Sequence, residues 1–156
     1  MQLLHNVAKF TTQTAHLKSI YTTYIRPVLE QSSVVWHSTL TLENSLDLER
    51  VQKAAVRLIM GSKHNSYESS LIELNLTKLA ERRRYLCLTF AKRTLANQKV
   101  KKMFPLRKEN RQQKRRHSEK FIVFKAKTER LRNSSILYMQ RLLNKDNKQK
   151  CQKEAP

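Results

Sequence analysis

Residues 41–61 read TLENSLDLERVQKAAVRLIMG, which is the pattern of a long amphipathic helix. Thr41 is a favourable N-cap, because its side-chain oxygen can accept a hydrogen bond from a backbone N–H of the first turn. Glu43 and Asp47 lie near the positive end of the helix dipole, and Gly61 follows the last apolar residue, where a positive φ commonly ends a helix. The apolar residues recur at helical spacing and predict one buried face, made of Leu48, Val51, Ala55, Leu58 and Ile59.

The opposite face of the same stretch is basic. Arg50, Lys53 and Arg57 stand at positions i, i+3 and i+7, so they share one side of the predicted helix. A basic stripe of this kind either contacts phosphates or is simply a solvated helix face, and for a single cluster the second interpretation is the more common. The stripe is therefore a candidate binding surface only together with other observations.

The rest of the chain also favours helices. The sequence has one Gly and three Pro, whereas β-sandwiches and barrels need many tight turns, in which Gly is preferred. Helical spacing predicts helices within 1–12, after Thr14, from Ser66 to near Leu74, from Thr77 onward and at 135–144. We predict an all-α fold: a small helical bundle with a basic, partly disordered C-terminal extension that ends in a short amphipathic helix.

The helix expected after Thr14 contains a proline. Its apolar stripe is predicted to consist of Leu17, Tyr21, Tyr24 and Val28. Pro27 should kink this helix, because it removes one backbone hydrogen bond. Residues 32–40 either continue the helix to about Trp36 or turn extended, since β-branched and aromatic residues favour strands.

Two further helices have a predictable inner face. The helix starting at Thr77 is expected to point Leu79, Leu86, Phe90 and Ala91 inward, and Cys87 lies in the same apolar run, where a buried thiol is expected. Ser134 is expected to cap the last helix, whose apolar face is predicted to consist of Leu137, Tyr138, Leu142 and Leu143.

The charge of the chain points to a polyanionic partner. The 156 residues include 32 Lys and Arg against 12 Asp and Glu, a formal net charge of +20. This excess is unusual for a soluble enzyme and makes nucleic acid the first expectation and an acidic membrane surface the second. Residues 1–98 carry 13 basic against 7 acidic residues, and residues 99–156 carry 19 against 5. We therefore expect a helical domain at 1–98, a basic linker at 99–120 and a C-terminal extension at 121–156.

The residues that a catalytic or metal site needs are missing from the sequence pattern. Two-metal polymerase and nuclease sites use clustered carboxylates, but the only two Asp are Asp47 and Asp146, and no two acidic residues are adjacent. The five His and two Cys have no ligand spacing, and there is no Gly-rich phosphate loop. We expect no catalytic residue, no metal and no cofactor. The sequence shows no secretion signal and no apolar span, so an intracellular location, nuclear or cytoplasmic, is expected.

Other basic residues add to the candidate surface. Arg82-Arg83-Arg84 cluster in the early turns of the helix that follows Thr77, and Lys114-Arg115-Arg116 form a second run. With Arg26 and the stripe at 50–57, these are the candidate phosphate contacts. Tyr21 and Tyr24 could stack on bases, although an aromatic stripe at helical spacing is more often part of a core.

The chain resembles one family over nearly its whole length. LKSIYTTYIRPVLEQSSVVWH at 17–37, STLTLEN at 38–44 and DLERVQKAA at 47–55 are similar, in order, to the region just past the catalytic palm in reverse transcriptases of jockey-like non-LTR retrotransposons. LAERR at 79–83, LCLTFAK at 86–92, MFPL at 103–106 and AKTERL at 126–131 continue the resemblance. Each segment is weak alone, but the ordered series is fairly specific.

The resemblance implies that residues 1–98 form a thumb-like helical domain. It implies that the whole chain corresponds to the thumb and post-palm region of an RNA-directed DNA polymerase. In that family the thumb helices hold the template–primer duplex, while the palm carries out the chemistry. The palm's Asp-Asp motif has no counterpart in this sequence. We therefore expect a fragment that binds RNA, DNA or a hybrid without catalysis of its own, with the palm of a full-length enzyme as a further partner.

Two rival interpretations stay open. In the first, helices that once packed on a palm expose an apolar face, and the chain is a protein-interaction module. In the second, the basic tail binds a membrane surface, for which the apolar residues Phe121–Phe124 give slight support. Salt-resistant oligomerisation would favour the first, and vesicle binding the second.

Overall fold

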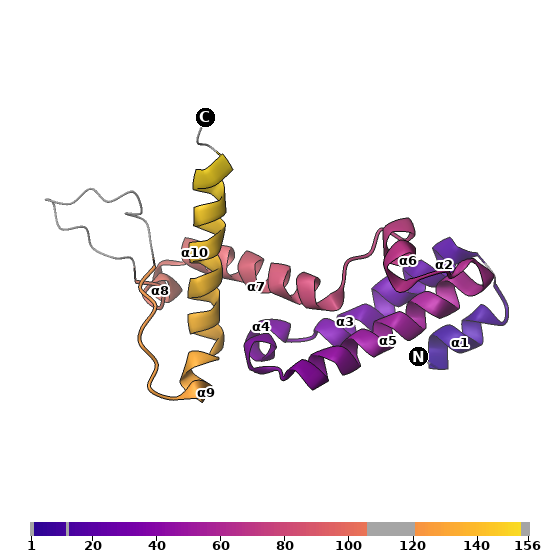
Figure 1. Ribbon diagram of the computed structural model, residues 1–156, viewed down its shortest axis with the longest axis horizontal. Helices are drawn as coiled ribbons and strands as arrows, with labels where there is room; N and C mark the ends of the chain where they lie inside the picture. Colours follow the sequence, from indigo (N-terminus) through magenta and orange to yellow (C-terminus); the bar gives the residue numbers. More distant parts are fainter. Residues whose placement is uncertain (1, 12, 106–120, 154–156) are drawn as a thin grey trace, which may run out of the picture. The chain divides into compact units, whose positions relative to one another are not determined.

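The structure is a computed structural model that describes residues 2–11, 13–105 and 121–153, with side chains described as far as residue 149 (Figure 1). These residues form helices and no β-strand, so the predicted all-α class is confirmed. The elements are α1 (Gln2–Ala8), α2 (Thr14–Ile20), the π-helix η1 (Tyr21–Ile25), α3 (Arg26–Glu30), α4 (Ser33–Trp36), the 3₁₀-helix η2 (His37–Thr39), α5 (Leu42–Met60), the 3₁₀-helix η3 (Gly61–Lys63), α6 (Tyr67–Glu73), α7 (Leu79–Ala96), α8 (Gln98–Lys101), α9 (Glu129–Arg132) and α10 (Ser135–Lys153).

The chain forms two compact units. The first unit comprises Met1–Ser33 and Leu40–Arg83, and the second comprises Val34–Thr39 and Arg84–Pro156. Their boundary falls inside α7, whereas the sequence suggested a boundary near residue 98. The difference has a physical reason: residue 98 marks a rise in positive charge, and charge reports surface composition rather than packing.

The core of the first unit lies between α1, α2, α5 and α6, which pack on one another in pairs. Ten apolar side chains are buried there: Leu4, Leu17, Tyr21, Ala55, Val56, Ile59, Met60, Leu71, Leu74 and Leu76. Burying an apolar side chain of this size contributes roughly 1.5–3 kcal/mol. This cluster is therefore the main source of stability in the first unit.

Helix α5 begins and ends as predicted. The Thr41 side chain accepts a 3.2 Å hydrogen bond from the backbone N–H of Asn44, and Gly61 has a φ of 54° at the other end. The buried face is rotated from the predicted one. Ala55 and Ile59 are buried as expected, but the other buried residues of α5 are Gln52, Val56 and Met60. Leu48, Val51 and Leu58 are only half-buried, because the face packs on α1 and α2 as well as on α6.

The helix after Thr14 changes its winding before Pro27. Residues Tyr21–Ile25 form the π-helix η1, in which the backbone N–H of Arg26 donates to the carbonyl of Tyr21, five residues earlier. Pro27 has no N–H, and its ring clashes with the carbonyl four residues before it in a regular α-helix. A wider turn at this point relieves that clash. The predicted disturbance at the proline is therefore present as a π-turn.

The wider turn changes which residues face the core. Leu17 and Tyr21 are buried as predicted, but Ile25 rather than Tyr24 packs on the core one turn later. Tyr24 is 63% exposed and Val28 is 70% exposed. The prediction that Tyr24 and Val28 point inward was wrong, because it assumed 3.6 residues per turn across a segment that has more.

The stretch at 32–40 is helical but not continuous with α3. Ser32 has a φ of 53° and separates α3 from α4, which covers Ser33–Trp36 and is followed by η2. The preference for helix to about Trp36 is thus correct in type, while the predicted continuity was wrong. The positive φ at Ser32 interrupts the helix, a conformation that a serine rarely adopts.

Helices α6 and α7 lie where they were predicted. Ser66 caps α6 by accepting a hydrogen bond from the backbone N–H of Ser69, at 3.2 Å. In α7, Leu79, Cys87 and Ala91 are buried. Leu86 is half-buried, and Phe90 is 49% exposed, so its predicted inward position was wrong.

The second unit has a separate core. Ala91, Phe104, Met139 and Leu143 are buried, and Val34, Leu88, Leu95 and Phe121 pack against them. Helix α10 starts after Ser134 as predicted but continues to Lys153 instead of ending near residue 144.

The predicted linker at 99–120 is structured in its first part. Residues 98–101 form α8, and Phe104 is buried, so this part is not the solvated segment that its lysines suggested. The rest of the linker, and with it the predicted disorder, lies outside the described residues.

Candidate nucleic-acid interface

The basic stripe of α5 lies on an exposed face of the first unit. Arg50, Lys53 and Arg57 are all exposed, on the side of the helix opposite to its buried residues. Arg50 pairs with Asp47 one turn earlier, and both side chains are well exposed, so the pair constrains the arginine little. The predicted grouping of these three residues on one solvent-facing surface is confirmed, while their contact with phosphate stays a prediction.

Lys53 packs on an aromatic ring. Its Nζ atom lies 5.3 Å from the ring centroid of Tyr67, within the range of a cation–π interaction. The Tyr67 hydroxyl donates a 2.5 Å hydrogen bond to Glu49 and accepts one of 2.9 Å from Gln52 Nε2. Burial, and then the bond to Glu49, raises the pKa of Tyr67 well above its usual range. Lys53 therefore rests on a fixed, neutral ring.

Three charged groups meet between α3 and α7. Arg82 Nε donates a 2.5 Å hydrogen bond to Glu30 Oε1, and Arg26 Nε lies 3.9 Å from the same oxygen. The Glu30 carboxylate is only 10% exposed, while Arg26 is 21% and Arg82 is 32% exposed. Two guanidinium groups thus share one carboxylate. The structure brings together two predicted contact residues, but it engages both in a partly buried ion pair.

The two remaining arginines of the run at 82–84 differ sharply. Arg83 is fully buried, and its Nη2 donates a 3.0 Å hydrogen bond to the Ser45 hydroxyl. Arg84 is exposed. A buried guanidinium that bonds within the protein cannot neutralise a phosphate, so Arg83 as a contact residue is corrected to a structural one. The reason is helical geometry: consecutive residues point about 100° apart, so three in a row cannot share one face.

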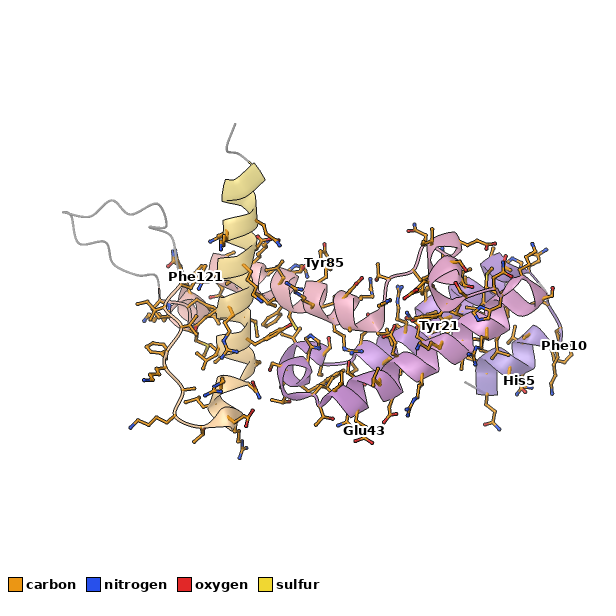
Figure 2. The ribbon with its side chains drawn as sticks, viewed as in Figure 1. His5, Phe10, Tyr21, Glu43, Tyr85 and Phe121 are labelled. Atoms are coloured by element: carbon orange, nitrogen blue, oxygen red, sulfur yellow. The ribbon has the colours of Figure 1, made fainter. Side chains whose placement is uncertain are left out.

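A buried network of hydrogen bonds holds α5, the helix that carries the basic stripe, against neighbouring segments. The Tyr21 hydroxyl donates a 2.7 Å hydrogen bond to Gln52 Oε1, and Gln52 Nε2 donates to the Tyr67 hydroxyl and to the Thr77 carbonyl, both at 2.9 Å. Glu49 Oε2 accepts from the backbone N–H of Leu79, the first residue of α7, at 3.1 Å. Tyr21 lies among the helices of the first unit in Figure 2. Its burial raises the pKa of Tyr21 well above its usual range, so the hydroxyl stays a donor.

The second unit contains polar contacts that the sequence did not suggest. His37 Nε2 lies 3.2 Å from the Tyr138 hydroxyl, and the two rings meet edge to face at 5.4 Å. Burial raises the pKa of Tyr138. Lys92 Nζ lies 2.8 Å from Asp146 Oδ2. The His and Tyr are 101 positions apart, so no local pattern could have paired them.

Most of the basic charge lies in the second unit. The first unit has 10 Lys and Arg against 7 Asp and Glu, and the second has 22 against 5. The predicted cluster Lys114, Arg115 and Arg116 lies outside the described residues. Within the described part of the second unit, the exposed cations that sequence reasoning passed over are Lys92, Arg93, Lys99, Lys101, Lys102, Lys125, Lys127, Arg130, Arg132, Lys145 and Lys148. The net charge of residues 99–156 was the signal that could have identified those from Lys99 onward.

Comparisons with known proteins add no relative. No protein-family model, no curated protein sequence and no solved structure matches this chain. Within residues 2–11, 13–105 and 121–153, no helix combines the length and the apolar character that crossing a bilayer requires. The same residues hold no group of three or more His, Cys, Asp or Glu side chains that could bind a metal ion.

Proposed function

We propose that this chain is the thumb and post-palm region of a jockey-like non-LTR retrotransposon reverse transcriptase. It binds a template–primer duplex of RNA, DNA or hybrid without sequence preference and has no catalysis of its own. The observation that carries the proposal is the exposed stripe of Arg50, Lys53 and Arg57 on α5, on a chain of net charge +20. The ordered sequence resemblance to that polymerase family supports the same role.

The spacing of the stripe fits a phosphate backbone. Seven residues of α-helix cover ~10 Å along the axis. Successive phosphates on one strand of a duplex advance ~3.4 Å along its axis, so the three cations span about three phosphates. Such contacts position a duplex but read no bases, which accounts for binding without sequence preference. Arg84 is a further candidate contact, and Arg26 and Arg82 contribute only if they exchange Glu30 for a phosphate.

Salt titration of duplex binding tests the proposal. The affinity of the full chain for a short RNA–DNA hybrid is measured by fluorescence anisotropy at several salt concentrations. Log K should fall linearly with log salt, by roughly 0.9 for each phosphate neutralised. The triple variant Arg50→Gln, Lys53→Gln, Arg57→Gln should lower this slope by about 2 to 3.

A matched control separates the stripe from general charge. The triple variant Lys9→Gln, Lys18→Gln, Lys63→Gln removes the same charge from the same unit at positions outside the stripe. Its slope should stay within about one phosphate contact of the unmodified chain. Absence of duplex binding at low salt, or equal losses in the two triple variants, would contradict the proposal.

A second candidate function is a helical protein-interaction module. Tyr24 and Val28 lie four residues apart and are 63% and 70% exposed. Leu42 and Leu46 of α5 have the same spacing and are 78% and 48% exposed. Exposed apolar pairs of this kind favour a protein partner or a second copy. Sedimentation at low and high salt distinguishes the two functions. Association that survives high salt and is lost in Tyr24→Ser, Val28→Ser would favour the module.

A further inference from the structure

Two basic segments of the second unit lie side by side. The backbone N–H of Ile122 donates a 2.8 Å hydrogen bond to the Pro105 carbonyl. The rings of Phe104 and Phe121 meet edge to face, with centroids 6.4 Å apart at an angle of 84°. These contacts join the turn that follows α8 to the non-helical segment that precedes α9. Phe121 marks this junction in Figure 2.

Helix α10 anchors both segments through two side chains one helical turn apart. Gln140 is fully buried, and its Nε2 donates a 3.0 Å hydrogen bond to the Met103 carbonyl. Asn144 accepts from the backbone N–H of Phe121 at 2.8 Å and donates to the carbonyl of the same residue at 3.0 Å. Both segments are therefore hydrogen-bonded to the same 19-residue helix. We refer to residues 97–105 and 121–128 together as the platform.

The platform presents cations and one aromatic ring to solvent. Its exposed lysines are Lys99, Lys101, Lys102, Lys125 and Lys127. Residues 97–105 and 121–128 contain no Asp or Glu, so no acidic residue within these segments offsets this charge. Phe124 is 59% exposed and stands directly before Lys125. Phe104 and Phe121 face the core, so Phe124 is the phenylalanine of the platform that is open to a ligand.

We propose that this platform binds single-stranded nucleic acid, with one base stacked on Phe124 and the neighbouring phosphates on the lysines. Exposed cations that can contact phosphates and an exposed aromatic ring on which a base can stack are what proteins use to bind a single strand without sequence preference. A duplex keeps its bases stacked inside, so it offers phosphates but no free base face to Phe124. A membrane surface is the less favoured partner, because the segment that carries Phe124 is not an amphipathic helix.

This site differs from the duplex contact proposed for α5 and does not depend on it. The two sites lie in different units and use different chemistry, stacking in one and phosphate contact alone in the other. Variants at α5 should weaken duplex binding, and variants at Phe124 should weaken single-strand binding. Failure of either proposal therefore leaves the other intact.

The test measures the affinity of the full chain for a labelled 12-nucleotide oligo-dT and for a blunt duplex of the same length. Phe124→Ala should weaken oligo-dT binding by roughly 5- to 100-fold, the loss of one stacked base, with duplex binding unchanged. Phe124→Trp should retain or strengthen it. Phe90→Ala is the matched control, because Phe90 is a half-exposed phenylalanine of the same unit that lies outside the platform.

The lysines are tested by salt dependence. Lys101→Gln with Lys125→Gln should lower the single-strand salt slope by about 1.4, whereas Lys145→Gln with Lys148→Gln on α10 should change it little. Unchanged oligo-dT affinity in Phe124→Ala, or an equal loss in Phe90→Ala, would overturn the proposal. The proposal would also be overturned if Phe124→Ala abolished binding to vesicles of anionic lipid but left oligo-dT binding unchanged. A helical circular dichroism signal equal to that of the unmodified chain shows that each variant is folded.

Discussion

The Tyr21 hydroxyl donates a 2.7 Å hydrogen bond to Gln52 Oε1, although the two residues are 31 positions apart. Gln52 is 1% exposed and uses both ends of its side-chain amide, since its Nε2 donates to Tyr67 and to Thr77. One glutamine thus joins the π-helix, α5, α6 and the segment that precedes α7. Because a buried polar group costs free energy unless it is paired, this arrangement favours one packing of the four segments over its alternatives.

Replacing Gln52 should destabilise the first unit strongly. Gln52→Leu leaves the Thr77 carbonyl and the Tyr21 hydroxyl without their partner, at a cost of about 1–3 kcal/mol for each buried group. We expect a loss of about 3 kcal/mol in the free energy of unfolding, measured by urea titration. Gln13→Leu makes the same chemical change at an exposed position and should cost less than about 0.5 kcal/mol. Equal stability of the two variants would contradict this role for Gln52.

Alkaline pH should destabilise the folded chain through Tyr21 and Tyr67. Burial raises both pKa values in the folded state, while the unfolded pKa is about 10. Their contribution to stability is therefore complete below pH ~10 and declines above it, as the unfolded state releases protons that the folded state retains. Each group adds up to about 1.4 kcal/mol per pH unit to this decline. Urea titrations between pH 8 and pH 11 should show a shallower decline for Tyr21→Phe, and an identical one would count against a neutral, buried Tyr21.

The π-helix makes opposite predictions for two adjacent residues. Ile25 packs on the core, so Ile25→Ala should lower the free energy of unfolding by about 2 kcal/mol. Tyr24 is mostly exposed, so Tyr24→Ala should change it by less than about 0.5 kcal/mol. A regular α-helix predicts the reverse order. Thermal or urea unfolding of the two variants therefore distinguishes the two windings.

Glu30 should contribute more than the exposed carboxylates. Glu30→Gln leaves Arg26 and Arg82 close together without the carboxylate that they share, and we expect a loss of about 1–2 kcal/mol after allowance for partial exposure. Asp47→Asn breaks the exposed pair with Arg50 and should cost less than about 0.5 kcal/mol. Similar losses in the two variants, measured by urea unfolding at moderate salt, would mean that partial burial adds nothing to the Glu30 pairs.

Asn144 should control the segment at Phe121. Asn144→Leu removes both hydrogen bonds to the Phe121 backbone and should lower local stability by about 1–2 kcal/mol. Hydrogen exchange of the Phe121 and Ile122 amides should then accelerate roughly 5- to 30-fold, while amides of α5 keep their rates. Gln149→Leu, an exposed change on the same helix, serves as the control and should leave all these rates as they are.

Sequence patterns predicted the elements that depend on local chemistry. The helix ends at Thr41, Gly61 and Ser66 follow from single residues whose side chain or φ acts within one turn. Inner faces were predicted where the helix is regular, as at Ala55 and Ile59. The inner face was missed at Tyr24, because the π-helix before Pro27 changes the number of residues per turn. It was also missed at Gln52, a polar residue that is buried because its hydrogen-bond partners come from other segments of the chain.

The candidate site was predictable in part for the same reason. The exposed stripe on α5 follows from helical spacing alone, because its residues lie on one regular helix. The burial of Arg83 depends on Ser45, which is 38 positions earlier, and no periodicity reports that contact. The platform around Phe124 was missed because its residues come from two segments that are joined by contacts between distant residues, such as the Pro105–Ile122 hydrogen bond and the Phe104–Phe121 ring contact.

Pro27 is exposed and carries no charge, yet it affects the positions of the charged residues Arg26 and Glu30. The wider turn before it rotates every later residue of α3 by roughly one residue, or about 100°, relative to α2. Without that rotation, Arg26 and Glu30 would face a different direction, and we expect that the ion pair between Glu30 and Arg82 would be lost. The ring and the missing N–H of Pro27 therefore influence the ion pairs of the first unit, so a substitution at Pro27 is expected to change the pairing of Glu30 with Arg82 as well as the local backbone.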